Sequence, residues 1–353
     1  MGKQRQNWTA APWDDREELE IAMVIPETAD TATIAFRSPS GAWFDYQPGQ
    51  FLTLELPVPG GPLLRTYTIS SSPSRPLSIS ITVKAQPGSI GTRWMLDHLK
   101  PGMRIKATGP AGQFTFLRHK ARKYLFISAG SGITPMMSMT MWAWDSGEMP
   151  DIAFVHAARK PADIIFKRRL EQFASRVPGL QLRFTVEEVD PFEVWSGFRG
   201  RLSQIMLGLM APDYLDREVF CCGPEPFMRS VREMLASLGY DMARYHEESF
   251  AAPALEEIQV ETAAPVGAAE VVFEGSGKTV SCDGTETILA IAKRSGLNIP
   301  SSCNFGLCGT CKVQKTAGEV TMVHNGGISD EEVADGKILA CCSRPKGTVS
   351  IAL

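Results

Sequence analysis

The chain has 353 residues, of which 44% are hydrophobic and 21% charged, and its formal net charge is −3. This length favours two or three domains over one, and this composition excludes a disordered, collagen-like or disulfide-stapled chain. The near balance of acidic and basic residues argues against nucleic acid as the main partner.

Residues 1–20 contain no apolar run, so the sequence predicts no secretory signal peptide. Residues 124–144 are uncharged and long enough to span a membrane. Gly130, Gly132 and Pro135 interrupt this stretch, however, which is typical of a buried strand, a glycine turn and a helix. We therefore expect a soluble, cytoplasmic protein that has no membrane partner.

Residues 18–119 are expected to form an antiparallel β-barrel. Strand-like runs alternate with turn signals there, at residues 19–25, 31–36, 50–56, 65–70, 77–84 and 104–109. Many short strands at this spacing are typical of a barrel. One helix is expected at residues 92–99, and Pro101 and Gly102 end it.

Residues 120–250 alternate between strand and helix patterns. The expected strands cover residues 124–130, 151–158, 180–188 and 217–224, and the expected helices cover residues 135–144, 161–174 and 226–238. Alternating units of this kind predict an α/β doubly wound domain, in which helices cover both faces of a parallel sheet.

Residues 251–268 are rich in Ala, Pro and Glu and are expected to be a linker. A hairpin is expected over residues 269–284 and a helix over residues 285–295. Asp283 and Glu286 are spaced as a capping box for that helix. Residues 269–353 are therefore expected to form a small α+β domain.

The cysteines concentrate in this last domain. Cys303, Cys308 and Cys311 follow the pattern C-x4-C-x2-C, and residues 312–340 separate Cys311 from Cys341. This is the spacing of the ligands of a plant-type [2Fe–2S] cluster, whose iron prefers soft thiolate ligands. The sequence therefore predicts these four cysteines as the cluster ligands.

Two alternatives stay open from the residues alone, a structural zinc site and a thioredoxin-like Cys308–Cys311 pair. Neither requires the upstream and the downstream cysteine. Cys342 lies next to the fourth expected ligand, and Cys341 is preferred on spacing. Gly306 and Gly309 are expected to let the loop curl tightly around the cluster.

An expected barrel strand carries Arg65, Tyr67, Thr68 and Ser70 in the order R-T-Y-T-I-S. This resembles the flavin motif R-x-Y-[S/T] of the ferredoxin–NADP reductase superfamily. The resemblance implies that Arg65 holds the flavin pyrophosphate, Tyr67 packs on the isoalloxazine and Thr68 offers a hydroxyl near N5, with Ser70 also at the cofactor. The alternative interpretation of this segment is an exposed strand that carries an Arg and a Tyr without binding a flavin.

A second segment of that superfamily, G-x-x-[S/T] before a short helix, closes on the pyrophosphate. Gly88, Gly91 and Thr92 match it here, and Thr92 is expected to supply the hydroxyl at the helix start.

Gly130, Ser131, Gly132 and Thr134 belong to the segment G-S-G-I-T-P, which follows an expected strand and opens a helix. It resembles the nicotinamide loop G-[ST]-G-[IV]-[AT]-P of the same superfamily. Glycines let a dinucleotide approach the backbone, and a helix N-terminus favours its phosphates.

Cys222, Gly223 and Pro224 begin a segment that resembles the superfamily motif C-G-P-x-x-[FM]-[ML]. The resemblance implies that Cys222 lies beside the nicotinamide C4 and that Gly223 leaves room for the ring; an ordinary core cysteine is the alternative. Glu248 and Phe250 form the E-x-F that ends this domain in many members. The resemblance implies that Glu248 lies at the edge of the flavin and that the Phe250 ring covers the flavin. Without the resemblance, Phe250 would be interpreted as a plain packing residue.

The dinucleotide preference is argued from charge. Glu187 and Glu188 follow the third expected strand of the α/β domain. Carboxylates would repel a 2′-phosphate and could accept hydrogen bonds from a ribose diol. NADH is therefore expected, although Arg159 and Lys160 nearby are a contrary feature.

The order flavin, nicotinamide, ferredoxin is similar to reductase components of Rieske-type oxygenases, above all those of glycine-betaine and related quaternary-ammonium demethylases. This implies a β-grasp ferredoxin domain and electron flow from NADH to FAD, to the [2Fe–2S] cluster and then to a separate acceptor protein, the terminal oxygenase. The reductase of a hybrid-cluster protein is the alternative of the same layout. A redox or metal sensor that turns nothing over is the alternative of another class.

Overall fold

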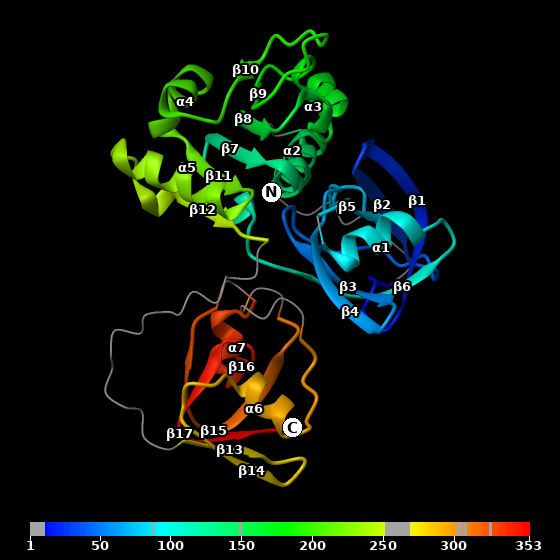
Figure 1. The fold of residues 1–353 in the computed structure, drawn as a ribbon, viewed down its shortest axis with the longest axis vertical. Coiled ribbons are helices and arrows are strands. Elements are labelled where there is room, and N and C mark those ends of the chain that lie inside the picture. Colours follow the sequence, from blue (N-terminus) through cyan, green and yellow to red (C-terminus); the bar gives the residue numbers. More distant parts are fainter. Residues whose placement is uncertain are drawn as a thin grey trace. The chain divides into compact units, whose positions relative to one another are not determined.

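The computed structural model describes residues 11–86, 88–147, 150–250, 269–301, 306, 309–324 and 327–353. These residues divide into two compact units (Figure 1). The first comprises most of the chain up to Ala251, and the second comprises Ala252–Leu353 together with the short segments Leu64–Thr66 and Ala111–Gln113. The expected linker, residues 251–268, lies outside the described residues.

The first unit begins with a six-stranded antiparallel sheet in the order β4-β3-β6-β1-β2-β5. A bridge between Ile69 and Ile81 joins the end of β4 to β5, and the Ser70 N–H donates to the Ser80 carbonyl at 2.7 Å. The sheet therefore closes on itself, which confirms the expected barrel. Its strands are β1 Leu19–Thr28, β2 Thr31–Arg37, β3 Phe51–Val58, β4 Gly61–Thr68, β5 Ile79–Lys84 and β6 Arg104–Ala111.

The second part of this unit is a six-stranded parallel sheet in the order β10-β9-β8-β7-β11-β12. Alternate residues of β7 belong to different cores: Phe126 packs in one cluster, and Leu125 and Ile127 pack in another. Both faces of the sheet are covered, which confirms the doubly wound fold. The strands are β7 Lys123–Ala129, β8 Asp151–Ala158, β9 Leu180–Val186, β10 Phe198–Arg199, β11 Glu218–Cys222 and β12 Tyr245–Glu248.

Four helices cover this sheet: α2 Ile133–Ser146, α3 Lys167–Ala174, α4 Gln204–Met210 and α5 Glu225–Ser237. Figure 1 shows α2 and α3 on one side of the sheet and α4 and α5 on the other. The helix expected over residues 161–174 is shorter than predicted. Phe166 has a left-handed backbone, φ 59°, and so separates a single 3-10 turn from α3. Residues 124–144 form β7 and most of α2, and no helix of the described residues is long and apolar enough to cross a membrane.

The second unit contains a five-stranded mixed sheet in the order β14-β13-β17-β15-β16, in which β13 runs parallel to β17. This confirms the α+β domain. Its elements are β13 Ala269–Phe273, β14 Lys278–Cys282, α6 Ile288–Arg294, β15 Lys312–Met322, α7 Asp330–Ala334, β16 Lys337–Leu339 and β17 Ser343–Ile351.

The capping box expected at Asp283 and Glu286 is wrong. Thr287 caps α6, because its hydroxyl accepts from the Ala290 N–H, and the Asp283 carboxylate binds Thr285 instead. The capping box of this unit is at α7, where Ser329 and Glu332 satisfy each other's backbone N–H groups.

Candidate functional site

Two glycine-containing loops meet at the carboxyl edge of the parallel sheet. The first leads from β7 into α2, and the second leads from β11 into α5. A Cβ at Gly132 would lie 2.1 Å from the Cys222 carbonyl oxygen and 2.6 Å from the Gly223 nitrogen. Only glycine permits this approach. The chain order reverses between β7 and β11, which is where open α/β sheets bind their ligands.

The loop after β7 is held by its own side chains. Gly130 has φ +54°, a conformation that favours glycine, and the Thr134 hydroxyl donates to the Ser131 carbonyl at 3.0 Å. These residues lie before and within the first turn of α2, as the motif predicts.

The loop after β11 is equally tight. A Cβ at Gly223 would lie 2.9 Å from the Phe227 ring and 3.2 Å from the Ala129 Cβ. Pro224 is the N-cap residue of α5, a position at which the missing backbone N–H of proline costs the helix no hydrogen bond. The absence of a side chain at Gly223 therefore lets this loop pack against the end of β7 and the first turn of α5.

Thr68, Cys222 and Glu248 come together from three strands. Cys222 and Glu248 are partners in the parallel register of β11 and β12, and the Thr68 hydroxyl donates to Glu248 Oε2 at 3.4 Å. All three residues are buried. The structure thus places the last residue of β4 in the barrel against the nucleotide domain.

Burial determines the protonation of this group. It raises the pKa of Glu248 to about 8, a shift that the hydrogen bond from Thr68 opposes. It also raises the pKa of the Cys222 thiol well above its usual range, and the neighbouring Glu248 adds to this shift. Both groups are therefore neutral at pH 7. Glu248 Oε1 has no hydrogen-bond partner among the described residues.

The rest of the flavin motif occupies β4 and the residues after it. Arg65 is exposed, and its guanidinium donates to the Leu64 carbonyl at 2.8 Å. Tyr67 is half-buried against the barrel core. The Ser70 hydroxyl lies 2.8 Å from the Thr82 hydroxyl, so a barrel partner already engages the Ser70 side chain.

Helix α1, Ile90–His98, follows the expected G-x-x-[S/T] segment. Its N-cap is Ser89, whose hydroxyl accepts from the Thr92 N–H, and not Thr92 as the sequence suggested. Thr92 lies in the first turn, and its own hydroxyl accepts from the Gln86 N–H at 3.2 Å. Gly88 has φ +73°, and Gly91 is buried in the first turn.

Phe250 follows β12 and is 40% exposed. Its ring is therefore outside the hydrophobic core, which argues against the alternative of a plain packing residue. An exposed aromatic two residues beyond Glu248 is suited to stack on a flat ligand.

Glu187 and Glu188 lie just after β9 at the same edge of the sheet. Glu188 is 3.7 Å from the Arg159 guanidinium and 3.8 Å from Lys160 Nζ, and Glu187 is 3.5 Å from the Arg201 guanidinium. The basic residues that could have bound a phosphate are thus paired with carboxylates.

Two of the four expected cluster ligands, Cys303 and Cys308, lie outside the described residues. The other two are buried side by side in the second unit, where the Cys341 N–H donates to Cys311 Sγ at 3.4 Å. An N–H group directed at a thiolate stabilises its negative charge, as cluster sites require.

The glycines of the cluster loop behave as expected. Gly306 and Gly309 have φ +75° and +72°. A Cβ at Gly306 would lie 2.8 Å from Cys342 Sγ, so the Cys342 thiol packs directly against Gly306. Cys282 is half-buried and packs at the edge of this core.

These observations fit the groups that the motifs imply. The unpartnered Glu248 Oε1 and the exposed Phe250 ring suit a flat heteroaromatic ligand, and Gly132 and Gly223 let the two loops pack closely at the same edge. Cys311 and Cys341 present soft donors close together for iron.

One constellation was not found from the sequence. His119, Glu218 and His246 lie together in the first unit, with donor atoms within 4.8 Å of one another. They are far apart in the chain and match no spacing motif, so only the fold reveals them.

Three family models match the chain in order: an oxidoreductase FAD-binding domain at residues 19–116, an oxidoreductase NAD-binding domain at 126–233 and a 2Fe-2S iron-sulfur cluster binding domain at 271–346. The chain is 61% identical to the stachydrine N-demethylase reductase subunit of Rhizobium meliloti, covering 96% of this chain and 97% of that one. It is 47% identical to the glycine betaine monooxygenase reductase subunit of Chromohalobacter salexigens, covering 98% and 96%.

Solved structures share the fold. Phthalate dioxygenase reductase matches with a TM-score of 0.61 at 23% identity, covering 97% of this chain and 100% of that one. An intact type IV self-sufficient cytochrome P450 monooxygenase matches with a TM-score of 0.73 at 23% identity, over 96% of this chain and 41% of that one. With barrel, doubly wound sheet and cysteine-bearing α+β domain in this order, the chain belongs to the family of NAD(P)H-dependent flavin and iron–sulfur reductases that carry a C-terminal [2Fe–2S] ferredoxin domain.

Proposed function

We propose that this chain is the reductase component of a quaternary-ammonium demethylating system. It takes electrons from NADH and passes them through FAD and a [2Fe–2S] cluster to a Rieske-type terminal oxygenase acting on a betaine such as stachydrine or glycine betaine. Similarity over nearly the whole chain to reductase subunits of two such systems supports the substrate class. The observation that carries the redox function is the meeting of Thr68, Cys222 and Glu248 at the switch point of the sheet.

FAD, when bound, accepts two electrons together and releases them singly, and so connects a hydride donor to a one-electron cluster. The chain's own residues bind and orient the reactants. Arg65 supplies a fixed cation for the diphosphate, and Tyr67 and Phe250 supply flat rings for stacking. Ser70, Gly88, Gly91 and Thr92 shape the same site.

The nicotinamide side depends on close backbone approach. Gly130, Ser131, Gly132 and Thr134 form the phosphate loop at the start of α2. Cys222, Gly223 and Pro224 form the wall opposite it, where a small neutral thiol leaves room for the ring.

Glu248 serves as the buried proton holder of the site. Its raised pKa keeps the carboxyl protonated at neutral pH. Because Thr68 donates to Oε2, the proton is left on Oε1, the oxygen without another hydrogen-bond partner among the described residues. A neutral donor thereby lies ready at the reacting edge without a buried negative charge.

NADH is the preferred donor in this proposal, because Glu187 and Glu188 neutralise the nearby Arg159, Lys160 and Arg201. The cluster is held by Cys303, Cys308, Cys311 and Cys341, with Cys342 as a packing residue. The domain boundaries that we propose are 18–119, 120–250 and 269–353, joined by a linker at 251–268.

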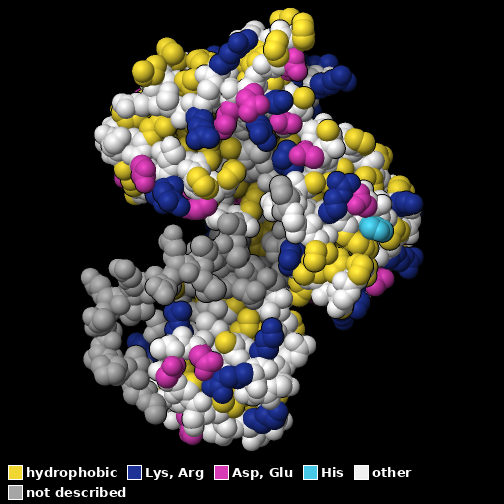
Figure 2. Space-filling view, in the orientation of Figure 1, with side chains coloured by type: hydrophobic (Ala, Val, Ile, Leu, Met, Phe, Trp, Pro, Cys, Tyr) yellow, Lys and Arg dark blue, Asp and Glu magenta, His cyan; other side chains and the backbone are white. Residues whose placement is uncertain are grey.

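Basic and acidic side chains are interspersed over the visible surface of the first unit in Figure 2. A mixed surface of this kind, with a net charge of −3 for the chain, makes a short-range fit more important for partner choice than long-range attraction.

The substrate class is tested by mixing the purified, cofactor-loaded protein with candidate Rieske oxygenases under NADH and oxygen. Consumption of a quaternary ammonium compound is the expected result. If the protein supports reduction of cytochrome c but no such oxygenase turns over with it, the substrate class is wrong.

The wiring is tested with Cys341→Ser and the matched control Cys342→Ser. We expect Cys341→Ser to abolish NADH-dependent cytochrome c reduction while NADH–ferricyanide activity is largely retained, because Thr68, Cys222 and Glu248 lie in the other unit. Cys342→Ser should retain both activities and the visible spectrum of the cluster. If Cys342→Ser alone lost the cluster, the fourth ligand would be Cys342; if neither protein reduced ferricyanide with NADH, the redox proposal would fail.

A further inference from the structure

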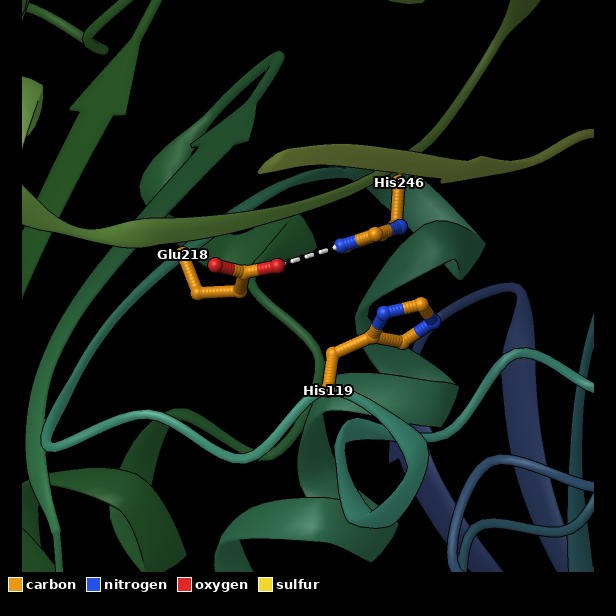
Figure 3. A group of neighbouring side chains, drawn as sticks. All are labelled: His119, Glu218 and His246. Carbon is orange, nitrogen blue, oxygen red and sulfur yellow. Dashed lines mark hydrogen bonds and ion pairs between the residues drawn. The ribbon is translucent and has the colours of Figure 1, made fainter. Parts of the chain in front are cut away.

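His119, Glu218 and His246 form a compact group on one face of the parallel sheet. His246 Nε2 lies 2.7 Å from Glu218 Oε1, and the two imidazole rings are 3.7 Å apart at 31°. Figure 3 shows the His119 ring beneath that of His246, with the Glu218 carboxylate beside both. One donor atom of each residue lies within 4.8 Å of the others.

The fold explains why these residues meet. Glu218 is the first residue of β11, and His246 lies opposite Phe220 on the neighbouring parallel strand β12. Because side chains alternate along strands, Glu218 and Phe220 point to the same face of the sheet. His119 lies just after the 3-10 turn Phe116–Arg118 in the connection from the barrel to β7, and its ring packs on Phe220 and His246.

The donor set has a definite chemistry. Two imidazole nitrogens and one carboxylate oxygen are the protein ligands of many three-residue zinc sites, which leave a fourth position open. Bonds of about 2.0–2.1 Å to a tetrahedral ion require donor separations of about 3.3 Å, within the spread observed here. The side chains of Glu218 and His246 are 14% and 16% exposed, so an ion can reach them.

The electrostatic surroundings favour nitrogen ligation. Burial and the neighbouring His246 lower the pKa of His119, so its imidazole is neutral and carries a free lone pair. Arg244 lies 3.3 Å from Glu218 Oε2 and also donates to the Leu215 and Asp216 carbonyls. Arg244 orients the carboxylate so that Oε1 faces the histidines. Its positive charge, however, weakens the binding of an ion that is held by oxygen ligands alone.

We propose that His119, Glu218 and His246 bind one divalent transition-metal ion of the Zn²⁺ class. The ion would take the place of the proton between His246 Nε2 and Glu218 Oε1, and a neutral His246 would then carry its proton on Nδ1. Mg²⁺ and Ca²⁺ would not compete, because they need more oxygen ligands than this group offers.

The site uses none of the residues proposed for the flavin, the nicotinamide or the cluster. Glu218 is at the opposite end of β11 from Cys222, and the cluster cysteines belong to the second unit. A bound ion would link the connection that carries His119 to the last two strands of the sheet. The expected effect is therefore to stabilise the first unit.

The test uses tag-free, full-length protein loaded with FAD and the cluster. The protein is dialysed against a buffer that holds free Zn²⁺ at about 1 μM. Zinc and iron per chain are measured in the same sample, so that loss of the cluster is detected. Wild type should hold about one zinc more than the double variant His119→Ala/His246→Ala. His98→Ala, which removes an exposed histidine of α1, should bind zinc as wild type does.

A second measurement reports stability. All seven tryptophans precede residue 252, so their fluorescence follows the first unit alone. Saturating Zn²⁺ should raise the unfolding temperature of wild type and His98→Ala by about 5 °C, and should leave that of the double variant unchanged.

Glu218→Gln keeps the shape of the side chain, and it tests zinc binding if the double variant fails to fold. It should bind zinc at least about tenfold more weakly than wild type, because the anionic ligand is lost. Equal zinc content in wild type and in each folded variant of the three residues would overturn the proposal.

Discussion

Glu248 is deeply buried, and among the described residues its carboxyl has one hydrogen bond, from the Thr68 hydroxyl to Oε2. In the unfolded chain its carboxyl has the usual pKa near 4.5, whereas burial raises the pKa to about 8 in the fold. Between these values the folded state holds one proton more than the unfolded state. The free energy of unfolding therefore decreases as pH rises through this window.

We predict that Glu248→Gln removes this dependence. In FAD-free protein, the wild-type free energy of unfolding should fall by about 1.4 kcal/mol per pH unit between about pH 5 and 8 because of this group. The difference in the free energy of unfolding between Glu248→Gln and wild type should change by the same amount per pH unit. Urea unfolding followed by tryptophan fluorescence measures it for the first unit.

The matched control is Glu247→Gln, which alters an exposed neighbour on the same strand. Its unfolding should keep the wild-type slope. Parallel pH profiles for wild type and Glu248→Gln would mean that the carboxyl is ionised in the fold.

Dinucleotide choice also rests on single residues. Replacing Glu188 by Ser should free Arg159 and Lys160, which lie 3.7 and 3.8 Å from it, to bind a 2′-phosphate. We expect kcat/KM for NADPH to rise about tenfold or more relative to NADH, and the gain to shrink in high salt because the charges are exposed. Ferricyanide reduction with each dinucleotide measures the ratio. Glu193→Ser, further along the same loop, should change it little, and an unchanged ratio for Glu188→Ser would place the phosphate elsewhere.

At the scale of elements, the site depends on two loops that nearly touch. Gly132→Ala would place a Cβ 2.1 Å from the Cys222 carbonyl oxygen and push the α2 loop away from β11. We expect KM for NADH to rise strongly and the first unit to lose about 1–3 kcal/mol of stability. Steady-state kinetics and urea unfolding measure the two effects.

Gly208→Ala is the control for that substitution. Gly208 lies inside α4 and has open space where a Cβ would be. Alanine should stabilise this helix by up to about 1 kcal/mol with unchanged KM. If Gly132→Ala behaved in the same way, the two loops would be further apart in solution than the structure places them.

Local sequence patterns predict some elements of this fold and not others. Runs of apolar residues predicted the strands of the barrel and four of the six strands of the parallel sheet within a few residues, since burial of alternating or continuous apolar faces is a local property. The short edge strands β10 and β12 were not predicted. The helix over residues 161–174 was overestimated because its first half lies in a 3-10 turn and at Phe166, whose positive φ no propensity predicts. The cap of α6 was misassigned because several hydroxyl and carboxyl residues compete there, and only the final backbone selects Thr287.

For the molecule as a whole, one polypeptide carries the two units that exchange electrons. Covalent connection makes the transfer from flavin to cluster a first-order step. We predict that, after anaerobic mixing with NADH, the rate constant of cluster reduction stays constant over about 1 to 20 μM protein. Stopped-flow absorbance measures it. A rate constant proportional to protein concentration would mean that transfer occurs between molecules.

By itself the sequence determined the order of the modules and the cofactor types, and it supplied the candidate site residues. These follow from motifs, because a cluster or a dinucleotide needs particular residue types at short spacings in the chain. Only the tertiary structure decided which distant residues share an environment. The raised pKa of Glu248, the contact between Gly132 and the strand end at Cys222, and the group formed by His119, Glu218 and His246 all depend on strands brought together by the sheet. Spacing along a chain carries no information about such neighbours, since burial and proximity arise only when the chain has packed.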